Sequence, residues 1–195
     1  MRGSAAPASC SPLYRTGLVQ IASFSMALSV TWLNKNNKEH HMPDHQHEGG
    51  CLCGQVRYTV IGQPEPRGVC HCRYCQLRTG SAFAVLAYFQ PQNFQLQHGE
   101  LSHYHFTSES DKNWDTYFCP RCGTTVYYQL EVWGDLIGID AGTFDPPSFF
   151  FDIAGEVFTQ SKAHFLGEIT ADNHYKMFPG YEPRNEEPGR LKTPS

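Results

Sequence analysis

The chain has 195 residues, with 15 Lys and Arg against 19 Asp and Glu for a formal net charge of -4. Because this slightly acidic chain lacks the clustered positive charge that phosphate binding requires, we expect no nucleic-acid partner. Hydrophobic residues make up 40% of the chain and aromatic residues 13%. This composition can build a core, so it excludes a wholly disordered protein. The length predicts one domain with tails.

The first 48 and the last 15 residues differ from the middle of the chain. Up to Lys38 there are four basic residues and no acidic one, and the apolar run 17–33 is interrupted by Ser, Thr and Gln. This run is too short and too polar for a membrane span. We interpret residues 1–48 as a disordered or targeting extension, with Met26 or Met42 as alternative translation starts. Residues 38–48 indicate a solvated, histidine-rich linker, and residues 181–195 a disordered tail.

Residues 49–180 consist of short β-prone runs separated by Gly, Pro and Asn. This texture is typical of an all-β domain built of small sheets. In one run, Val56, Tyr58 and Val60 alternate with other residues, as in a half-buried strand. Short helices are expected only after Cys72 and near residues 171–177. The predicted strands are 55–61, 82–89, 94–97, 101–107, 116–118, 124–130 and 136–140.

The eight cysteines make up about 4% of the chain, below the roughly 8–10% of disulfide-stapled scaffolds. Cys10 stands alone, and the other seven form three close groups: Cys51 and Cys53; Cys70, Cys72 and Cys75; Cys119 and Cys122. Seven is an odd number, and the two cysteines of a Cys-x-Cys are poorly placed to form a disulfide with each other. This spacing therefore predicts metal coordination.

The segment from Cys119 to Gly123 has the form of a zinc knuckle, in which backbone N–H groups turn toward two sulfurs. The glycine after the second cysteine tolerates the left-handed conformation that this turn requires. A redox Cys-x-x-Cys would open a helix, whereas β-prone residues follow here. A matching turn is offered by Cys51 and Cys53, which are followed by Gly54. The four cysteines are expected to close a structural zinc site.

Three cysteines, Cys70, Cys72 and Cys75, remain as a second set. Three protein ligands leave one coordination position open, as in catalytic zinc sites. Two alternatives stay open: His71 or another side chain closes this site and makes it structural, or the cysteine pairs are exchanged between the two sites. Since His71 lies between two ligands, its side chain is expected to point away from their metal.

Four motifs occur in order along the chain: GGCLCGQVRY at 49–58, CHCRYCQ at 70–76, RTGSAF at 78–83 and FCPRCGT at 118–124. Through them residues 49–165 resemble the family of glutathione-dependent formaldehyde-activating enzymes and centromere protein V. The resemblance implies a mostly β, Mss4-like fold of small antiparallel sheets organised around two zinc ions. It also implies the ligand sets Cys51, Cys53, Cys119 and Cys122 for structural zinc and Cys70, Cys72 and Cys75 for catalytic zinc.

The activity that this resemblance implies is a carbon–sulfur lyase, which forms S-hydroxymethylglutathione reversibly from glutathione and formaldehyde. A thiol in the open position would lose its proton because the metal lowers its pKa. Arg73 and Arg78 are candidates for binding a glutathione carboxylate. Candidates for proton transfer are Tyr74, His71 and His164. After residue 125 the likeness is looser, which leaves the thiol and the aldehyde open.

A non-catalytic zinc module that binds protein partners, as the centromere protein V branch implies, is the alternative function. The Arg and Lys residues of this chain are scattered along the sequence, which argues against nucleic-acid binding in particular. A third hypothesis is an enzyme that uses another thiol or aldehyde. We expect a cytoplasmic protein because an oxidising compartment would threaten the thiolates, with organellar targeting by residues 1–48 as the alternative.

Overall fold

The computed structural model describes residues 45–183, so Cys10, both alternative start sites and nearly all of the predicted extension and tail lie outside the described residues. The described part is mostly β, as predicted. Its helical elements are α1 (Arg73–Thr79) and the 3₁₀ turns η1 (Pro91–Asn93), η2 (Glu131–Trp133), η3 (Ala141–Thr143) and η4 (Thr159–Ser161). The strands are β1 (Gln46–Gly50), β2 (Arg57–Ile61), β3 (Arg67–Cys70), β4 (Ala84–Phe89), β5 (Phe94–His98), β6 (Ser102–Thr107), β7 (Asn113–Phe118), β8 (Thr125–Leu130), β9 (Ile137–Asp140), β10 (Gly155–Val157) and β11 (Asn173–His174).

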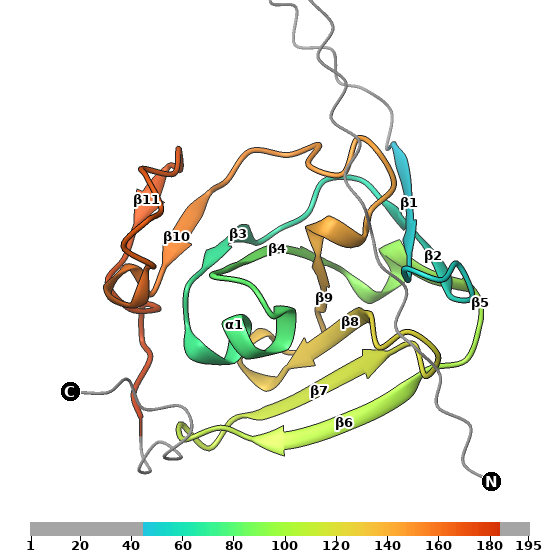
Figure 1. Ribbon diagram of the computed structural model, residues 1–195, viewed down its shortest axis with the longest axis horizontal. Coiled ribbons are helices and arrows are strands. Elements are labelled where there is room, and N and C mark those ends of the chain that lie inside the picture. Colours follow the sequence, from blue (N-terminus) through green and yellow to red (C-terminus); the bar gives the residue numbers. More distant parts are fainter. Residues whose placement is uncertain (1–44, 184–195) are drawn as a thin grey trace, which may run out of the picture. The chain divides into compact units, whose positions relative to one another are not determined.

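These strands form two sheets (Figure 1). The smaller sheet is antiparallel and has the order β1-β2-β5. The larger sheet has eight strands in the order β11-β10-β3-β4-β9-β8-β7-β6. Its β10 runs parallel to both β3 and β11, so this sheet is mixed and larger than the small antiparallel sheets we expected. The parallel pairs arise because the chain crosses back after β9 to reach the far edge of the sheet.

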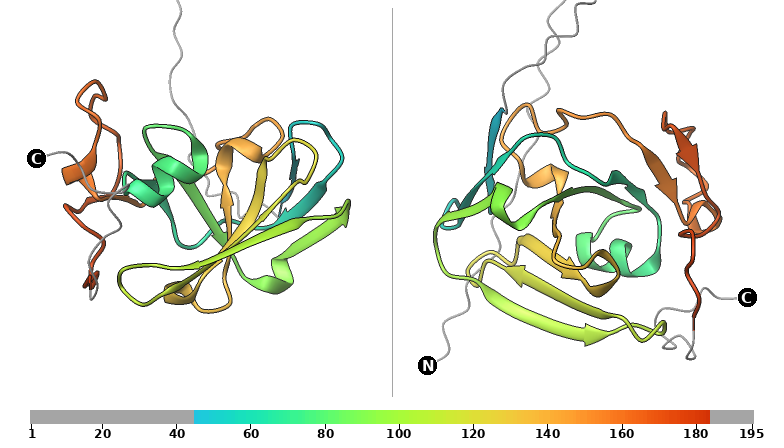
Figure 2. Two further views of the ribbon diagram at one scale, coloured as in Figure 1. Left: turned by 60° about the horizontal axis from the view of Figure 1, so that its bottom comes forward. Right: turned by 180° about the vertical axis from the view of Figure 1, so that it is seen from behind.

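The helix α1 lies between the β10–β11 segment and the strands β7 and β8 in all views (Figures 1 and 2). Its position follows directly from its sequence neighbours, because β3 ends at Cys70 and α1 begins at Arg73. The helix ends at Gly80, which adopts a left-handed conformation with φ 63°. A glycine is favoured there because it has no Cβ to clash. The predicted short helix after Cys72 is thus confirmed.

The main core lies between the two sheets and includes the side chains of Val56, Tyr58 and Val60, which are fully buried. These three residues face the core as expected, but Thr59 between two of them is also buried, so the strand is more than half-buried. Two cysteines, Cys51 and Cys119, belong to the same core. Burial of apolar surface holds these distant segments together. A metal held by these cysteines would therefore lie against the main core.

Two local predictions differ from the structure. The residues of the expected linker at 46–48 form most of β1, which pairs with β2 from Gln46 opposite Ile61 onward. Their polar side chains conceal the strand because four of its five residues are only partly buried or exposed. The helix expected near 171–177 is wrong, since Asn173 and His174 form the short strand β11 beside β10. Pairing with a strand distant in sequence overrides local preference there.

Candidate functional site

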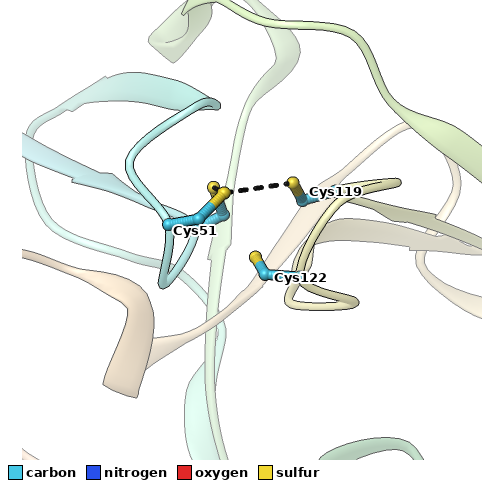
Figure 3. A group of neighbouring side chains, drawn as sticks. Cys51, Cys119 and Cys122 are labelled. Atoms are coloured by element: carbon cyan, nitrogen blue, oxygen red, sulfur yellow. Dashed lines mark hydrogen bonds between the residues drawn. The ribbon is translucent and has the colours of Figure 1, made fainter.

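Four cysteine sulfurs converge where two turns meet in the main core. Cys51 and Cys53 come from the turn after β1, and Cys119 and Cys122 from the turn between β7 and β8. Figure 3 shows the sulfurs of Cys51, Cys119 and Cys122 pointing toward one another. The four Sγ atoms all lie within 4.8 Å of each other. The structure therefore brings together the four residues that the sequence assigned to one site.

The spacing of these sulfurs fits a tetrahedral zinc ion. The Sγ atoms of Cys51 and Cys53 lie 3.5 Å apart, and those of Cys53 and Cys119 lie 3.7 Å apart. Zn–S bonds of about 2.3 Å in a tetrahedron place sulfurs roughly 3.8 Å from one another. The backbone would not have to rearrange for the sulfurs to reach that geometry. The residues present thus fit a closed four-cysteine metal site.

Both turns have the knuckle geometry that the sequence predicted. Gly54 and Gly123 each have φ 73°, the left-handed conformation in which a side chain would be strained. The N–H of Gly54 donates to the carbonyl of Cys51 at 3.0 Å, and the N–H of Gly123 donates to the carbonyl of Cys119 at 2.9 Å. The first bond spans three residues and the second four, so the two turns differ in length. In both turns the N–H of the first cysteine donates to a carbonyl five residues later, that of Val56 at 3.0 Å and that of Thr124 at 2.9 Å. Each turn presents two sulfurs on one side of the chain.

Hydrogen bonds to the sulfurs shift the acidity of the four-cysteine cluster. The Thr124 hydroxyl and then its backbone N–H lower the pKa of Cys122 to about 5. At Cys53 the Gln55 N–H lowers the pKa, but burial and the neighbouring sulfurs outweigh it and raise the pKa to about 11. These opposite shifts are what several thiols in one site produce, since each thiolate disfavours the next. A bound cation removes that conflict.

The second cluster contains Cys70, Cys72 and Cys75, whose Sγ atoms also lie within 4.8 Å of one another. Cys70 ends β3, Cys72 caps the N-terminus of α1, and Cys75 lies in its first turn. The N–H of Cys75 donates to the Cys72 sulfur at 3.4 Å. A strand end and one helical turn therefore suffice to bring three sulfurs together. This set is again the one that the spacing predicted.

The two clusters differ in their access to a cavity. A cavity of about 910 Å³ is lined by Cys70, Cys72 and Cys75 and by none of the four cysteines of the other cluster. Its volume is near the upper end of the range for pockets that bind drug-sized molecules. Aromatic side chains make up much of the wall, among them Tyr74, Tyr88, Trp114, Tyr128, Trp133, Phe158 and Phe178. The three-cysteine cluster therefore borders a space large enough for a small molecule.

The side chain of His71 points away from the cavity. It is fully buried, and its Nε2 lies 2.8 Å from a carboxylate oxygen of Glu156. The same carboxylate pairs with Lys162 at 2.8 Å and with His174 at 2.6 Å. His71 does not line the cavity, and it belongs to neither cysteine cluster. It serves as a structural link between the cysteine loop and β10, consistent with the expected orientation away from the metal.

Of the two arginines predicted to bind a carboxylate, Arg78 is already engaged. Its guanidinium forms a buried ion pair with Asp140 and lies over the Tyr128 ring, 3.9 Å from its centroid. One of its nitrogens also lies 4.0 Å from the Cys75 sulfur, and this charge contributes, after Cys70 and Cys72, to lowering the pKa of Cys75. Arg73 lines the cavity and, within residues 45–183, hydrogen-bonds to the Gln76 amide oxygen at 3.4 Å. We therefore replace the predicted pair by Arg73 alone.

Two buried acidic residues that the sequence analysis missed contact residues adjacent in sequence to the three cysteines. Glu156 binds His71, as described above, and is only 2% exposed. Glu109 is 5% exposed, lines the cavity, and accepts a hydrogen bond from the Tyr74 hydroxyl. His164, a predicted proton carrier, is exposed and does not line the cavity. No periodic signal marks Glu109, which follows two hydroxyl residues in a loop.

Comparison with known proteins places the chain in a family. The family model of the glutathione-dependent formaldehyde-activating enzyme matches residues 46–161, more than half of the chain. An uncharacterized lyase of Schizosaccharomyces pombe is 26% identical over 83 residues, covering 43% of this chain and 57% of the relative. A Halomonas elongata protein named for glutathione-dependent formaldehyde activation is 26% identical over 102 residues, covering 50% of this chain and 65% of the relative.

The matches thus span between 57% and 65% of the length of these two curated relatives. A solved structure of a Rhodobacter sphaeroides protein aligns with a TM-score of 0.42 and 20% identity, covering 53% of this chain and 95% of that protein. That likeness is too distant to add to the argument. Within residues 45–183, no helix is long and apolar enough to cross a bilayer. By the match to residues 46–161, the chain belongs to the glutathione-dependent formaldehyde-activating enzyme family.

Proposed function

We propose that this protein is a zinc-dependent carbon–sulfur lyase that adds a thiol such as glutathione reversibly to a small aldehyde such as formaldehyde. The observation that carries the proposal is the opening of the three-cysteine cluster onto the cavity of about 910 Å³. A cluster that served only to hold the fold would gain nothing from such access. The family match and the names of the two relatives support the same reaction class.

Two zinc ions per chain are proposed, one in each cluster. Cys51, Cys53, Cys119 and Cys122 would hold the structural ion, because their four sulfurs complete a tetrahedron inside the core. Cys70, Cys72 and Cys75 would hold the catalytic ion, which would lower the pKa of an incoming thiol. Seven thiolates would be at risk of oxidation outside a reducing compartment. We therefore also propose a cytoplasmic location.

The protein's own side chains supply binding and orientation. Trp114, Trp133 and Phe158 contribute aromatic walls to the cavity, and an apolar surrounding strengthens polar interactions inside it. Arg73 stands at the start of α1, next to Cys72, and has no carboxylate partner within residues 45–183. Its guanidinium is suited to a carboxylate of glutathione. The chain thus offers both a site for the thiol and a charge to orient the remainder of the molecule.

Metal analysis of cysteine variants tests the division into two sites. Wild-type protein should contain two zinc ions per chain, and Cys72→Ser should lose one while its circular dichroism and unfolding midpoint stay close to wild type. Cys119→Ser should lose the other ion and unfold at much lower urea, since structural zinc contributes directly to folding. Cys10→Ser, which leaves the other seven cysteines unchanged, is the control. Unfolding of Cys72→Ser to the same extent as Cys119→Ser would show that the second site is structural.

A panel of thiols and aldehydes tests the reaction itself. Because thiols and formaldehyde also combine spontaneously, the rate should be measured at equilibrium by NMR exchange between free thiol and adduct. Wild-type protein should accelerate this exchange for at least one pair, and Cys72→Ser should not. Absence of acceleration for every pair would contradict the lyase and favour the non-catalytic module that binds protein partners.

A further inference from the structure

Glu109 is a buried carboxylate for which the metal clusters provide no explanation. It lies in the loop between β6 and β7, is 5% exposed, and lines the same cavity as the three cysteines. Acidic residues are almost never buried unless they are paired. Within residues 45–183, Glu109 forms no ion pair with a cationic side chain. Lys112, three residues later in the chain, pairs instead with Glu131 at 2.9 Å. Burying a carboxylate without a cationic partner costs free energy, so its presence in this cavity points to a function.

The Tyr74 side chain links this carboxylate to the helix that follows the cysteine loop. Tyr74 lies on α1 between Cys72 and Cys75, and its hydroxyl donates a hydrogen bond to Oε2 of Glu109. Its ring packs on Phe106 and Trp114, with centroids 5.3 Å and 5.4 Å away. Both Tyr74 and Glu109 line the cavity. A ring fixed on two sides gives the carboxylate a defined position relative to the helix that carries two of the cysteines.

The histidines that would be the more common proton carriers do not reach the cavity. His71 is fully buried against Glu156, and His164 is exposed outside the cavity wall. A thiol addition nevertheless moves a proton, since the S–H bond is lost and an O–H bond is made. General acid–base catalysis requires a group within hydrogen-bond reach of the substrate. Among the described residues that line the cavity, Glu109 and Tyr74 form a hydrogen-bonded pair of proton-bearing side chains.

We propose that Glu109 is the general acid–base of this site, positioned by Tyr74, an inference that rests on the proposed thiol–aldehyde lyase function. The carboxylate accepts the S–H proton of the thiol as the sulfur forms its bond to the aldehyde carbon. The π electrons of the carbonyl move to its oxygen, and Glu109 returns the proton to that oxygen to give the hydroxyl of the adduct. The reverse reaction retraces these transfers. Atoms and electrons balance without an oxidant or a further reactant.

The variant Glu109→Gln separates this role from a merely structural one. The glutamine carbonyl still accepts the Tyr74 hydrogen bond, but its amide cannot carry the proton. In full-length, zinc-loaded protein with glutathione and ¹³C-formaldehyde, NMR exchange should show kcat lower by about 10²–10⁴-fold. KM, zinc content and urea midpoint should stay as in wild type. Glu109→Asp should recover part of kcat, and Glu100→Gln, an exposed glutamate in another turn, is the matched control.

The variant Tyr74→Phe tests the positioning part. It removes the hydrogen bond but leaves the carboxylate, so kcat should fall less than in Glu109→Gln. Three results would overturn the inference. A wild-type protein without acceleration removes the proposed function and this role together. An active wild type whose Glu109→Gln variant loses less than about tenfold removes this role alone. Loss of zinc or of stability in Glu109→Gln would show that the carboxylate is structural.

Discussion

The carboxylate of Glu156 joins three segments that surround the cysteine loop, and its removal should destabilise the fold. It pairs with His71 at 2.8 Å, Lys162 at 2.8 Å and His174 at 2.6 Å. Breaking a buried charged network by deleting one partner costs about 3–5 kcal/mol. The side chains of Lys162 and His174 are 19% and 44% exposed, so water can replace part of what they lose. We therefore expect Glu156→Ala to lower the free energy of unfolding by about 3 kcal/mol.

Urea denaturation of the zinc-loaded protein under reducing conditions measures this loss. The control is Glu65→Ala, whose carboxylate pairs with Arg67 at 2.7 Å but is 74% exposed, so that it should cost less than about 1 kcal/mol. Fully buried His71 keeps no replacement partner in Glu156→Ala, which is why this variant should differ from the control. Equal losses of unfolding free energy in Glu156→Ala and Glu65→Ala would refute the view that burial makes the Glu156 network more stabilising than an exposed ion pair.

The same network sets a pH dependence. Burial alone would raise the pKa of Glu156, but hydrogen bonds from Lys162, His174 and His71 outweigh it and lower the pKa from its usual value of 4.5 to about 2. Since the folded state binds this proton more weakly than the unfolded state, the stabilisation is complete above about pH 4.5 and disappears toward pH 2. The stability difference between wild type and Glu156→Gln should be constant above that window and shrink within it. A difference that grew on acidification would contradict the assignment.

Three further perturbations have calculable outcomes. In Gly138→Ala the new Cβ would lie 2.2 Å from the ring of fully buried Tyr128. Urea denaturation should therefore show that the free energy of unfolding falls by about 1–3 kcal/mol. The control is Gly142→Ala, which has open space around the new Cβ and should stay near wild type. Asp140→Ala leaves the Arg78 guanidinium, 8% exposed, without its carboxylate, and should cost about 3–5 kcal/mol in the same assay; a loss below 1 kcal/mol would contradict a buried pair. A chelator that removes the two proposed zinc ions should unfold the domain cooperatively, because structural zinc contributes its binding free energy to folding, and added zinc should restore the circular dichroism spectrum.

The division of seven cysteines into four and three could be predicted from the sequence. A knuckle is encoded in a few consecutive residues, since Cys119 and Cys122 are placed by one turn and Gly123 supplies its left-handed conformation. The three-cysteine set depends on one strand end and one helical turn, which are equally local. The alternation of Val56, Tyr58 and Val60 likewise needs only the geometry of a strand. Features decided within about ten residues were therefore accessible without the structure.

The tertiary structure alone decided how the candidate site is surrounded. Glu109 lies in a polar loop that carries no periodic signal, it is buried in the fold, and its hydrogen-bond partner Tyr74 lies on α1, 35 residues earlier. The cavity wall formed after residue 154 depends on β10 pairing in parallel with β3, which lies more than 80 residues earlier. The helix expected near 171–177 failed for the same reason, as His174 is held by Glu156. Turn chemistry is local and can be inferred from sequence, whereas the burial of a charged group is determined by distant partners.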